Sequence, residues 1–308
     1  MQFAMLFPGQ GSQSVGMMNG FEEHAIIKQT FEHAADILKQ DVWAMVTQPN
    51  ELLNQTTNTQ PLMLIAGFAT WKLWQSQIGT LPSAMAGHSL GEYTALVAAG
   101  VISFEDALPL VRYRAEVMQG AVAEGVGAMA AILGLEDSVV NEVCQSAAQG
   151  QVLEAVNLNS PGQVVIAGHR EAVERGMEAA KAKGAKRALL LPVSVPSHCA
   201  LMKPAADKLA SYLQNVQFST PTVQVLQNAD VIAYQDAEKI KDALVRQLYS
   251  PVRWVETVQT LREQGITQAF ECGPGKVLAG LAKRIVDDFN CVAIINNDAL
   301  TEAKNLTA

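Results

Sequence analysis

The chain has 308 residues, of which 49% are hydrophobic and 17% charged, so it can bury a large core without the help of disulfides or metals. The formal net charge is -8 and the basic residues form no stripe, which argues against a nucleic-acid-binding protein. The four cysteines lie far apart and lack metal-ligand spacing, so we expect no metal site and a reducing, cytoplasmic location.

The first elements of the chain alternate between strand and helix. Residues 2–7 predict a short buried strand that ends at Pro8-Gly9. We expect no signal peptide here, because the segment lacks a basic region and its apolar run ends too early. Apolar residues at helical spacing predict one amphipathic helix over 31–38 and another that follows a Thr59 cap and an early Pro61. No apolar run approaches the roughly 20 residues that cross a bilayer, so we expect no membrane partner.

A second strand, over residues 83–87, turns directly into a helix of small residues. The turn reads Gly-His-Ser-Leu-Gly and matches the Gly-x-Ser-x-Gly nucleophile elbow in the strand-to-helix context that this motif requires. Ser89 is therefore the candidate nucleophile, and the backbone amide of Leu90 is a candidate oxyanion donor. The alternative interpretation is an ordinary tight turn.

The order of predicted strands and helices changes after residue 123. Residues 127–192 predict strands and helices in the order βαββαβ, which is the split ferredoxin-like unit. Helices and strands then alternate again up to a last strand near residue 295. We therefore expect an α/β fold in which an α/β-hydrolase-like large domain, residues 1–123 and 196–308, carries an inserted ferredoxin-like small domain, residues 124–195.

A nucleophilic serine needs a base, and the chain has only five histidines. Two of them fall in the leading helix, one adjoins the serine and one lies at the end of an inserted strand. The remaining one, His198, lies in a loop where the chain returns from the insert, a position that favours a cleft. A solvated loop histidine is the alternative, and the sequence identifies no group that orients the ring.

Arg114 lies on the apolar stripe of the helix that follows a Ser103 cap, whereas Arg112 lies off that stripe. A guanidinium that faces inward requires an anion. That anion is either a protein carboxylate, with Glu92 as the candidate, or the carboxylate of a substrate. Pro109 lies in the same helix, and a kink there would shift the stripe.

The loop after the first strand reads Gly9-Gln10-Gly11-Ser12-Gln13. It is not a dinucleotide fingerprint, because Ser14 replaces the third glycine and the helix begins too late. A glycine loop in this position can supply backbone amides to an oxyanion, and the amide of Gln10 is our candidate. A flexible connection is the alternative.

Taken together, five motifs resemble the malonyl-CoA:acyl carrier protein transacylase family of bacterial fatty-acid synthesis. They appear in the family's order along nearly the whole chain, with the insert between the third and the fourth. The motifs are Pro8-Gly9-Gln10-Gly11-Ser12-Gln13, Gly87-His88-Ser89-Leu90-Gly91-Glu92-Tyr93, Arg114, Pro196-Ser197-His198 and Glu271-Cys272-Gly273-Pro274-Gly275.

The resemblance implies a role for each matching residue. Ser89 would be the nucleophile, His198 the general base, and Arg114 the bidentate partner of the malonyl carboxylate. The family's oxyanion hole uses backbone amides that match Gln10 and Leu90. A main-chain carbonyl, in place of the carboxylate found in hydrolases, would orient the histidine. Gln247 matches the family's glutamine in the helix before a Ser-Pro turn and would bind substrate, whereas without the resemblance it would read as a surface residue at a helix end. Asn157 and Asn159 match the family segment that lines the cleft from the small domain.

The resemblance also implies the substrates. Malonyl-CoA would load the serine, and the phosphopantetheine thiol of holo acyl carrier protein would accept the malonyl group, with no bound cofactor. We expect a monomer. Two basic clusters are candidate contacts for the acidic carrier: Lys181, Lys183, Lys186 and Arg187, or Lys276, Lys283 and Arg284.

Several alternatives stay open at this point. A serine hydrolase would need an acid, for which Asp106 or Asp137 is available, although Arg114 argues against it. A non-catalytic carrier-docking protein would keep the fold without an ester on the serine. The segment Val195-Pro196-Ser197-His198 matches neither the malonyl nor the methylmalonyl form of modular synthases, so another acyl specificity, or service to a polyketide pathway, also stays open.

Overall fold

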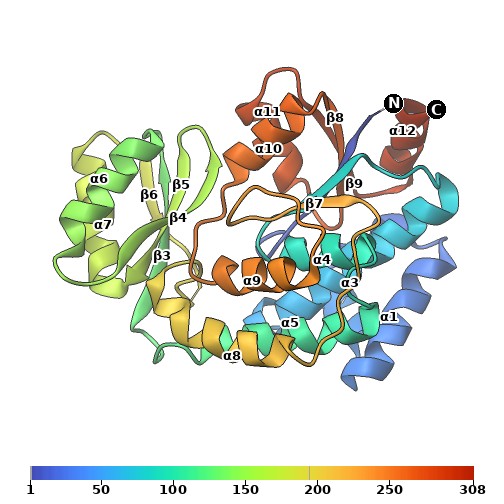
Figure 1. The fold of residues 1–308 in the computed structure, drawn as a ribbon, viewed down its shortest axis with the longest axis horizontal. Coiled ribbons are helices and arrows are strands. Elements are labelled where there is room, and N and C mark those ends of the chain that lie inside the picture. The colour runs from blue at the N-terminus through green and yellow to red at the C-terminus, as the bar shows by residue number, and fades with distance from the viewer. Residues whose placement is uncertain (1, 194) are drawn as a thin grey trace.

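A parallel sheet lies at the centre of the larger part of the molecule (Figure 1). The computed structural model describes residues 2–193 and 195–308, and within them five strands form this sheet. All neighbours in the sheet are parallel. From one edge to the other the strands are β7 (Gln224–Leu226), β2 (Ala84–Gly87), β1 (Ala4–Phe7), β8 (Gln268–Cys272) and β9 (Asn290–Ile294).

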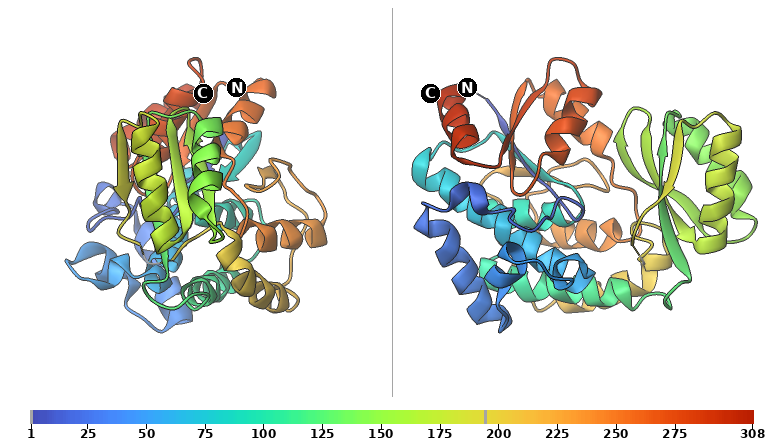
Figure 2. Two further views of the ribbon diagram at one scale, coloured as in Figure 1. Left: turned by 90° about the vertical axis from the view of Figure 1, so that its left-hand side faces the viewer. Right: turned by 180° about the vertical axis from the view of Figure 1, so that it is seen from behind.

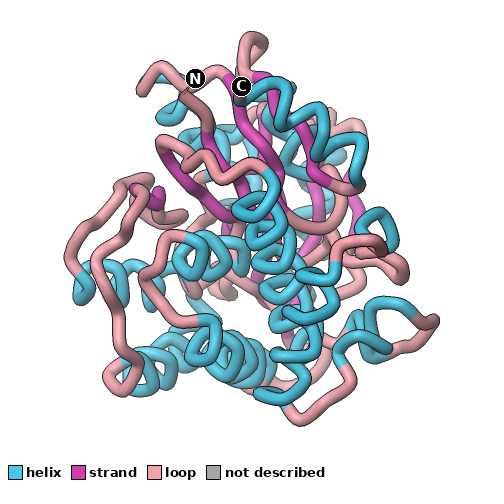
Figure 3. The backbone as a smooth tube through the Cα atoms, turned by 90° about the vertical axis from the view of Figure 1, so that its right-hand side faces the viewer, coloured by secondary structure: helices cyan, strands magenta, loops and turns pink. Residues whose placement is uncertain are grey.

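Helices cover both faces of this sheet, as Figure 3 shows for the strands seen between helical layers. The alternation in β1 explains the two layers, because Met5 and Phe7 pack into one core while Ala4 and Leu6 pack into another. The second core contains α10 (Trp254–Glu263) and α11 (Val277–Ile285). The first contains α1 (Ala25–Leu38), α2 (Val42–Thr47), α3 (Thr56–Gln77), α4 (Leu90–Ala98), α5 (Phe104–Gln119), α8 (Lys203–Leu213), α9 (Ala237–Gln247) and α12 (Asn297–Thr307).

The small sheet is antiparallel and has two helices on one face. Its elements confirm the predicted βαββαβ order, and within the described residues the strands run β4-β5-β3-β6. Alternate residues of β3 and β5 pack under the helices, whereas Met129 and Val165 belong to the opposite face. The elements are β3 (Gly127–Leu133), α6 (Asp137–Ala148), β4 (Leu153–Ser160), β5 (Gln163–His169), α7 (Arg170–Ala182) and β6 (Arg187–Leu190).

The predicted α/β fold class is therefore confirmed: a large α/β part and a ferredoxin-like small part lie side by side (Figure 2). Backbone hydrogen bonds join the two parts, since Leu158 N–H donates to Val252 O at 3.0 Å and Val252 N–H donates to Val156 O at 2.8 Å. The face of the small sheet that carries no helices is turned toward the large part. We propose residues 124–195 as the extent of the inserted domain.

The helix that was predicted to follow a Thr59 cap differs in two ways. It begins at Thr56, so Thr59 and Pro61 lie inside it, and the Thr59 hydroxyl instead donates to Leu53 O at 2.6 Å. It is also buried nearly all round rather than amphipathic, because α1, α4 and α5 surround it. No helix in the described ranges is both long and apolar enough to cross a membrane.

Candidate active site

The strand-to-helix turn between β2 and α4 places Ser89 in a strained conformation. Its φ of 51° and ψ of -110° lie outside the ordinary regions for a residue with a side chain. Glycine at position 87 is required, since a Cβ there would lie 1.9 Å from the carbonyl carbon of Gly91. The predicted nucleophile elbow therefore has the tight backbone that presents a serine hydroxyl at a helix N-terminus.

Gly91 lets α4 approach the end of β1, because a Cβ at this position would lie 2.0 Å from Phe7 O. We expect Gly91→Ala to lower the free energy of unfolding by about 1–3 kcal/mol or more, since two backbone segments must separate. Gly280→Ala is the matched control: Gly280 is an exposed glycine of α11 whose added Cβ would meet nothing within 4 Å. Urea unfolding of both variants decides the matter, and equal midpoints would contradict the close approach.

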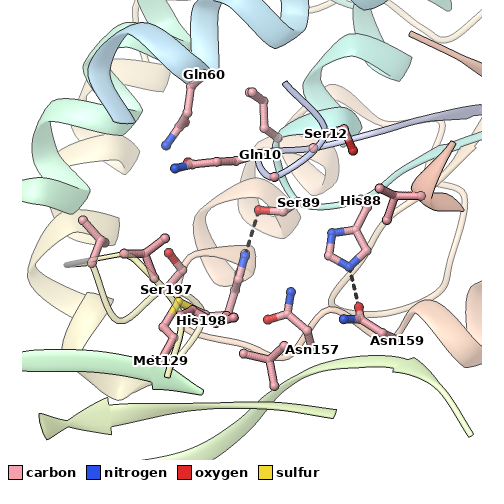
Figure 4. A pocket seen from close by; sticks show the side chains of 18 of the residues that line it. Gln10, Ser12, Gln60, His88, Ser89, Met129, Asn157, Asn159, Ser197 and His198 are labelled. Atoms are coloured by element: carbon pink, nitrogen blue, oxygen red, sulfur yellow. Dashed lines mark hydrogen bonds between the residues drawn. The ribbon is translucent and has the colours of Figure 1, made fainter. Parts of the chain in front are cut away.

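His198 lies directly against the serine (Figure 4). Its Nε2 is 2.8 Å from Ser89 Oγ, and its Nδ1 is 2.8 Å from the main-chain oxygen of Gln247. Because a carbonyl oxygen can only accept, Nδ1 carries the ring proton and Nε2 is left free to take the serine proton. Burial and the nearby Arg114 charge lower the pKa of His198 to about 3, so the ring is neutral near pH 7.

The two aspartates that a hydrolase could use lie elsewhere. Asp106 is exposed and pairs with the Ser103 hydroxyl at the start of α5, and Asp137 lies in the first turn of α6 in the small part. Within the described residues, the group that orients His198 is thus the carbonyl of Gln247, as the family resemblance implied.

Arg114 is the charged group of the site and is only 1% exposed. Its guanidinium donates to the side-chain oxygens of Gln60 and Gln247, at 2.7 and 2.9 Å, and to Ser89 Oγ at 3.3 Å. It also lies over the ring of Tyr93, with Cζ 5.3 Å from the centroid. Burial lowers the pKa of this group, but an arginine keeps its charge in a protein.

No carboxylate of the described residues forms an ion pair with Arg114. Glu92, the alternative partner considered above, does not contact the guanidinium directly. Gln247 lies between them, donating to Glu92 Oε2 at 3.0 Å while it accepts from Arg114. The direct hydrogen-bond partners of the buried cation are therefore uncharged, and its Nε has none among the described residues, an arrangement that leaves room for an anionic ligand.

The two candidate oxyanion donors lie beside the serine. Leu90 begins α4, so its N–H is one of the unpaired amides at a helix N-terminus. The Ser89 N–H is occupied instead, since it donates to Asn228 Oδ1 at 2.7 Å. Gln10 lines the cleft from the glycine loop, which packs so closely on the elbow that a Cβ at Gly9 would lie 2.4 Å from His88 O.

The two asparagines of β4 face the site from the small part (Figure 4). Asn159 Oδ1 is 2.8 Å from His88 Nε2, so the amide holds the ring of the residue that adjoins Ser89. Burial lowers the pKa of His88, which keeps this ring neutral. Asn157 also lines the cleft, and its Oδ1 has no hydrogen-bond partner in the described part of the chain.

Together these side chains enclose a cleft of about 260 Å³ between the two parts of the molecule. Apolar residues from the small sheet and from α11 close its other walls, among them Met129, Val165, Leu278 and Leu281. Among the described residues, no cluster of three His, Cys, Asp or Glu side chains is arranged to hold a metal ion. A buried cation, a serine–histidine pair and amide donors in one cleft suit acyl transfer from an anionic substrate.

Gln60 and Asn228 contact the site residues, although no motif in the sequence marked either of them. Gln60 is a buried polar residue in a helix whose buried positions are mostly apolar, and that contrast was a usable signal. Asn228 follows β7, and polar residues at the carboxyl ends of parallel strands often reach a ligand site. Its side chain holds the strand-to-helix turn in place, because it accepts a hydrogen bond from Ser89 N–H and donates one to Gly87 O, each at 2.7 Å.

Comparison with known proteins gives consistent matches along the whole chain. The family model described as "Acyl transferase domain" matches residues 4–295. The chain is 57% identical over 304 residues to the malonyl CoA-acyl carrier protein transacylase of Salmonella typhimurium, an alignment that covers 98% of both proteins.

Solved structures match equally closely. The acyl-carrier-protein S-malonyltransferase of Burkholderia pseudomallei superposes with a TM-score of 0.98 at 55% identity, covering 99% of this chain and all 100% of that one. A malonyl-transacylase solved in complex with a type II polyketide acyl-carrier protein also has a TM-score of 0.98, at 54% identity and with the same coverage.

Proposed function

Because the chain belongs to the acyl transferase family that contains the malonyl-CoA:acyl carrier protein transacylases, we propose that it transfers malonyl from malonyl-CoA to the phosphopantetheine thiol of an acyl carrier protein. The relatives that carry this name match over nearly their whole length. Fatty-acid synthesis is the pathway that we propose. A carrier of a polyketide pathway is the alternative, supported by the relative solved with such a partner.

One observation carries this proposal: the guanidinium of Arg114 is buried, has no carboxylate partner among the described residues, and lies 3.3 Å from the serine hydroxyl. A malonyl thioester bound with its carbonyl at Ser89 would extend its free carboxylate toward this cation. The buried charge would then gain a directly bound anion. An acetyl or a long-chain acyl group offers no such anion.

The proposed acylation half-reaction uses His198 as the base. Nε2 takes the proton of Ser89 Oγ as that oxygen attacks the malonyl thioester carbonyl, and the main-chain carbonyl of Gln247 stabilises the resulting imidazolium through Nδ1. The amides of Gln10 and Leu90 stabilise the oxyanion of the tetrahedral intermediate. The carbon–sulfur bond then breaks, and the CoA thiolate leaves with the proton from the imidazolium.

The second half-reaction repeats the attack with the carrier's thiol. His198 takes the thiol proton, the sulfur attacks the ester carbonyl, and Ser89 leaves with the proton returned. The enzyme is regenerated, so the cycle is of the ping-pong type. Side chains and backbone amides carry every step of the proposed cycle, which therefore requires no bound cofactor.

Of the two candidate basic clusters, we propose the one on α11 as the contact for the acidic carrier. Residues of this helix line the cleft. Lys276 directly precedes the helix and Lys283 and Arg284 lie in its last turn, so the cluster accompanies an element that borders the entrance for a phosphopantetheine arm. All three are exposed. We further propose a monomer that works in the cytoplasm without nucleic acid, in keeping with four free cysteines and a net charge of -8.

The test is intact-mass spectrometry after brief exposure to malonyl-CoA without carrier, followed by addition of holo acyl carrier protein. We expect a malonyl adduct on the enzyme, an equivalent of free CoA, and transfer of the adduct to the carrier. An adduct that water removes as fast as the carrier would indicate a hydrolase instead. No adduct and no free CoA, with carrier binding intact, would indicate a docking protein.

A further inference from the structure

Glu92, in the first turn of α4, is a carboxyl group with no solvent exposure. Its Oε2 accepts hydrogen bonds from Asn228 N–H at 2.8 Å and from Gln247 Nε2 at 3.0 Å. Its Oε1 is buried too and has no hydrogen-bond partner within the described residues. A buried carboxylate with one unpaired oxygen is costly, so its ionised form needs a compensating charge nearby.

Arg114 supplies that charge through a single intervening side chain. The amide of Gln247 accepts from Arg114 Nη2 at 2.9 Å and donates to Glu92 Oε2, so the cation and the carboxyl group flank one amide. When it is ionised, Glu92 thus offsets the charge of the guanidinium in the absence of a ligand, and each charge stabilises the other. The same cation is the group to which the substrate carboxylate is assigned above.

Resting on the proposed function, we propose that Glu92 takes up a proton from solvent when the carboxylate of malonyl-CoA binds Arg114. Two carboxylates cannot share one buried cation without mutual repulsion in a region of low dielectric constant. Neutralising Glu92 removes the repulsion, and Oε2 can keep both of its hydrogen bonds as an acceptor. Arg114 would then be balanced by one anion at a time, either ionised Glu92 or the carboxylate of the substrate.

Glu92 is the group of this site that changes charge near neutral pH. Burial raises the pKa of Glu92 to about 7, and its hydrogen bonds and Arg114 limit the rise. The other titratable groups around it keep one state: burial raises the pKa of Tyr93, the pKa of His198 is lowered to about 3, that of His88 is lowered by burial, and that of Asp230 is held low by its paired Arg246.

The direction of the pH effect follows from linkage. A bound carboxylate raises the pKa of Glu92 further, so the complex keeps the proton to higher pH than the free enzyme does. Below about pH 7 the free enzyme is already protonated and binding takes up little; as pH rises through 7, uptake grows and affinity falls. A rise of one pKa unit would weaken malonyl-CoA binding about tenfold once the pH exceeds both values.

Isothermal titration calorimetry on a Ser89→Ala background, which blocks transfer, measures this uptake directly from the heats in buffers of different ionisation enthalpy. We expect malonyl-CoA to take up more protons at about pH 8 than at about pH 6. Acetyl-CoA is the matched ligand: it carries the same nucleotide but no carboxylate, so its proton count should not include the Glu92 contribution.

Glu92→Gln separates a charge role from a purely structural one. The glutamine oxygen can still accept from Asn228 and Gln247, and we expect the variant to lose the extra proton uptake and to bind malonyl-CoA about tenfold more tightly than the parent above about pH 8, with equal affinity near pH 6. A residue that only positions its neighbours would instead weaken malonyl-CoA and acetyl-CoA alike at every pH.

The two proposals fail in different ways. If malonyl-CoA gives no binding heat at any pH, the proposed function fails. If malonyl-CoA binds with the same proton count as acetyl-CoA in the parent protein, the function stands and the role of Glu92 is wrong. That second measurement needs no substitution at position 92, so it holds even if Glu92→Gln folds poorly.

Discussion

Ser89→Ala should form no malonyl adduct and should lower the rate of transfer to carrier on the order of 10⁴-fold or more, because the covalent half of the cycle is lost. The hydroxyl lies 2.8 Å from Nε2 of His198, the proposed base, at the strained turn between β2 and α4. Initial rates with holo acyl carrier protein, together with intact mass after exposure to malonyl-CoA, measure both effects.

Two variants sharpen this expectation. His198→Ala should reduce the acylation rate about 10²- to 10⁴-fold, since it removes the base but leaves the nucleophile in place. Ser12→Ala, which changes another serine that lines the cleft, is the matched control and should act within a few-fold of the parent. An adduct on Ser89→Ala as abundant as on the parent would place the ester on another residue.

Arg114→Ala should reverse the preference between malonyl-CoA and acetyl-CoA. Loss of a buried charged hydrogen-bond partner costs about 2–4 kcal/mol, so kcat/KM for malonyl-CoA should fall about 30- to 10³-fold. Acetyl-CoA makes no contact with the guanidinium charge and should lose far less. The measured quantity is the ratio of the two kcat/KM values, which cancels any shared loss of folded enzyme.

Two further arginine variants control this experiment. Arg114→Lys keeps the charge but not the two-pronged geometry, so it should fall between the parent and the alanine variant. Arg112→Ala, two residues earlier on α5, removes a partly buried arginine that bonds Gln40 and lies away from the cleft, and its ratio should equal the parent's. An unchanged ratio in Arg114→Ala would remove the carboxylate clamp from the mechanism.

Local pattern was sufficient for the elbow, the inserted βαββαβ unit and the inward position of Arg114. The elbow depends on a contiguous strand, two glycines and a helix, so all its determinants are adjacent in sequence. The stripe on α5 separated Arg114, which is buried, from Arg112, which is partly exposed, because helical periodicity alone fixes which side chains face the core. Pro109 did not interrupt that helix.

The start of α3 shows where local pattern was insufficient. Thr59 and Pro61 resemble a helix start, yet the helix begins at Thr56 because its first turn packs into the core, where Thr59 finds a partner in Leu53. The cap that the sequence suggested was replaced by a contact that only the folded chain provides.

By itself, the sequence determined the fold class, the turn that carries the candidate nucleophile and an inward-facing cation, since each depends on neighbours within a few turns of the chain. Only the tertiary structure decided which groups complete the site. His198 contacts Ser89, which lies 109 positions away in the sequence. Gln247 bonds both Arg114, 133 positions away, and Glu92, 155 positions away. Such hydrogen bonds depend on distances and angles that are set by packing between distant elements, so no periodicity in the sequence predicts them.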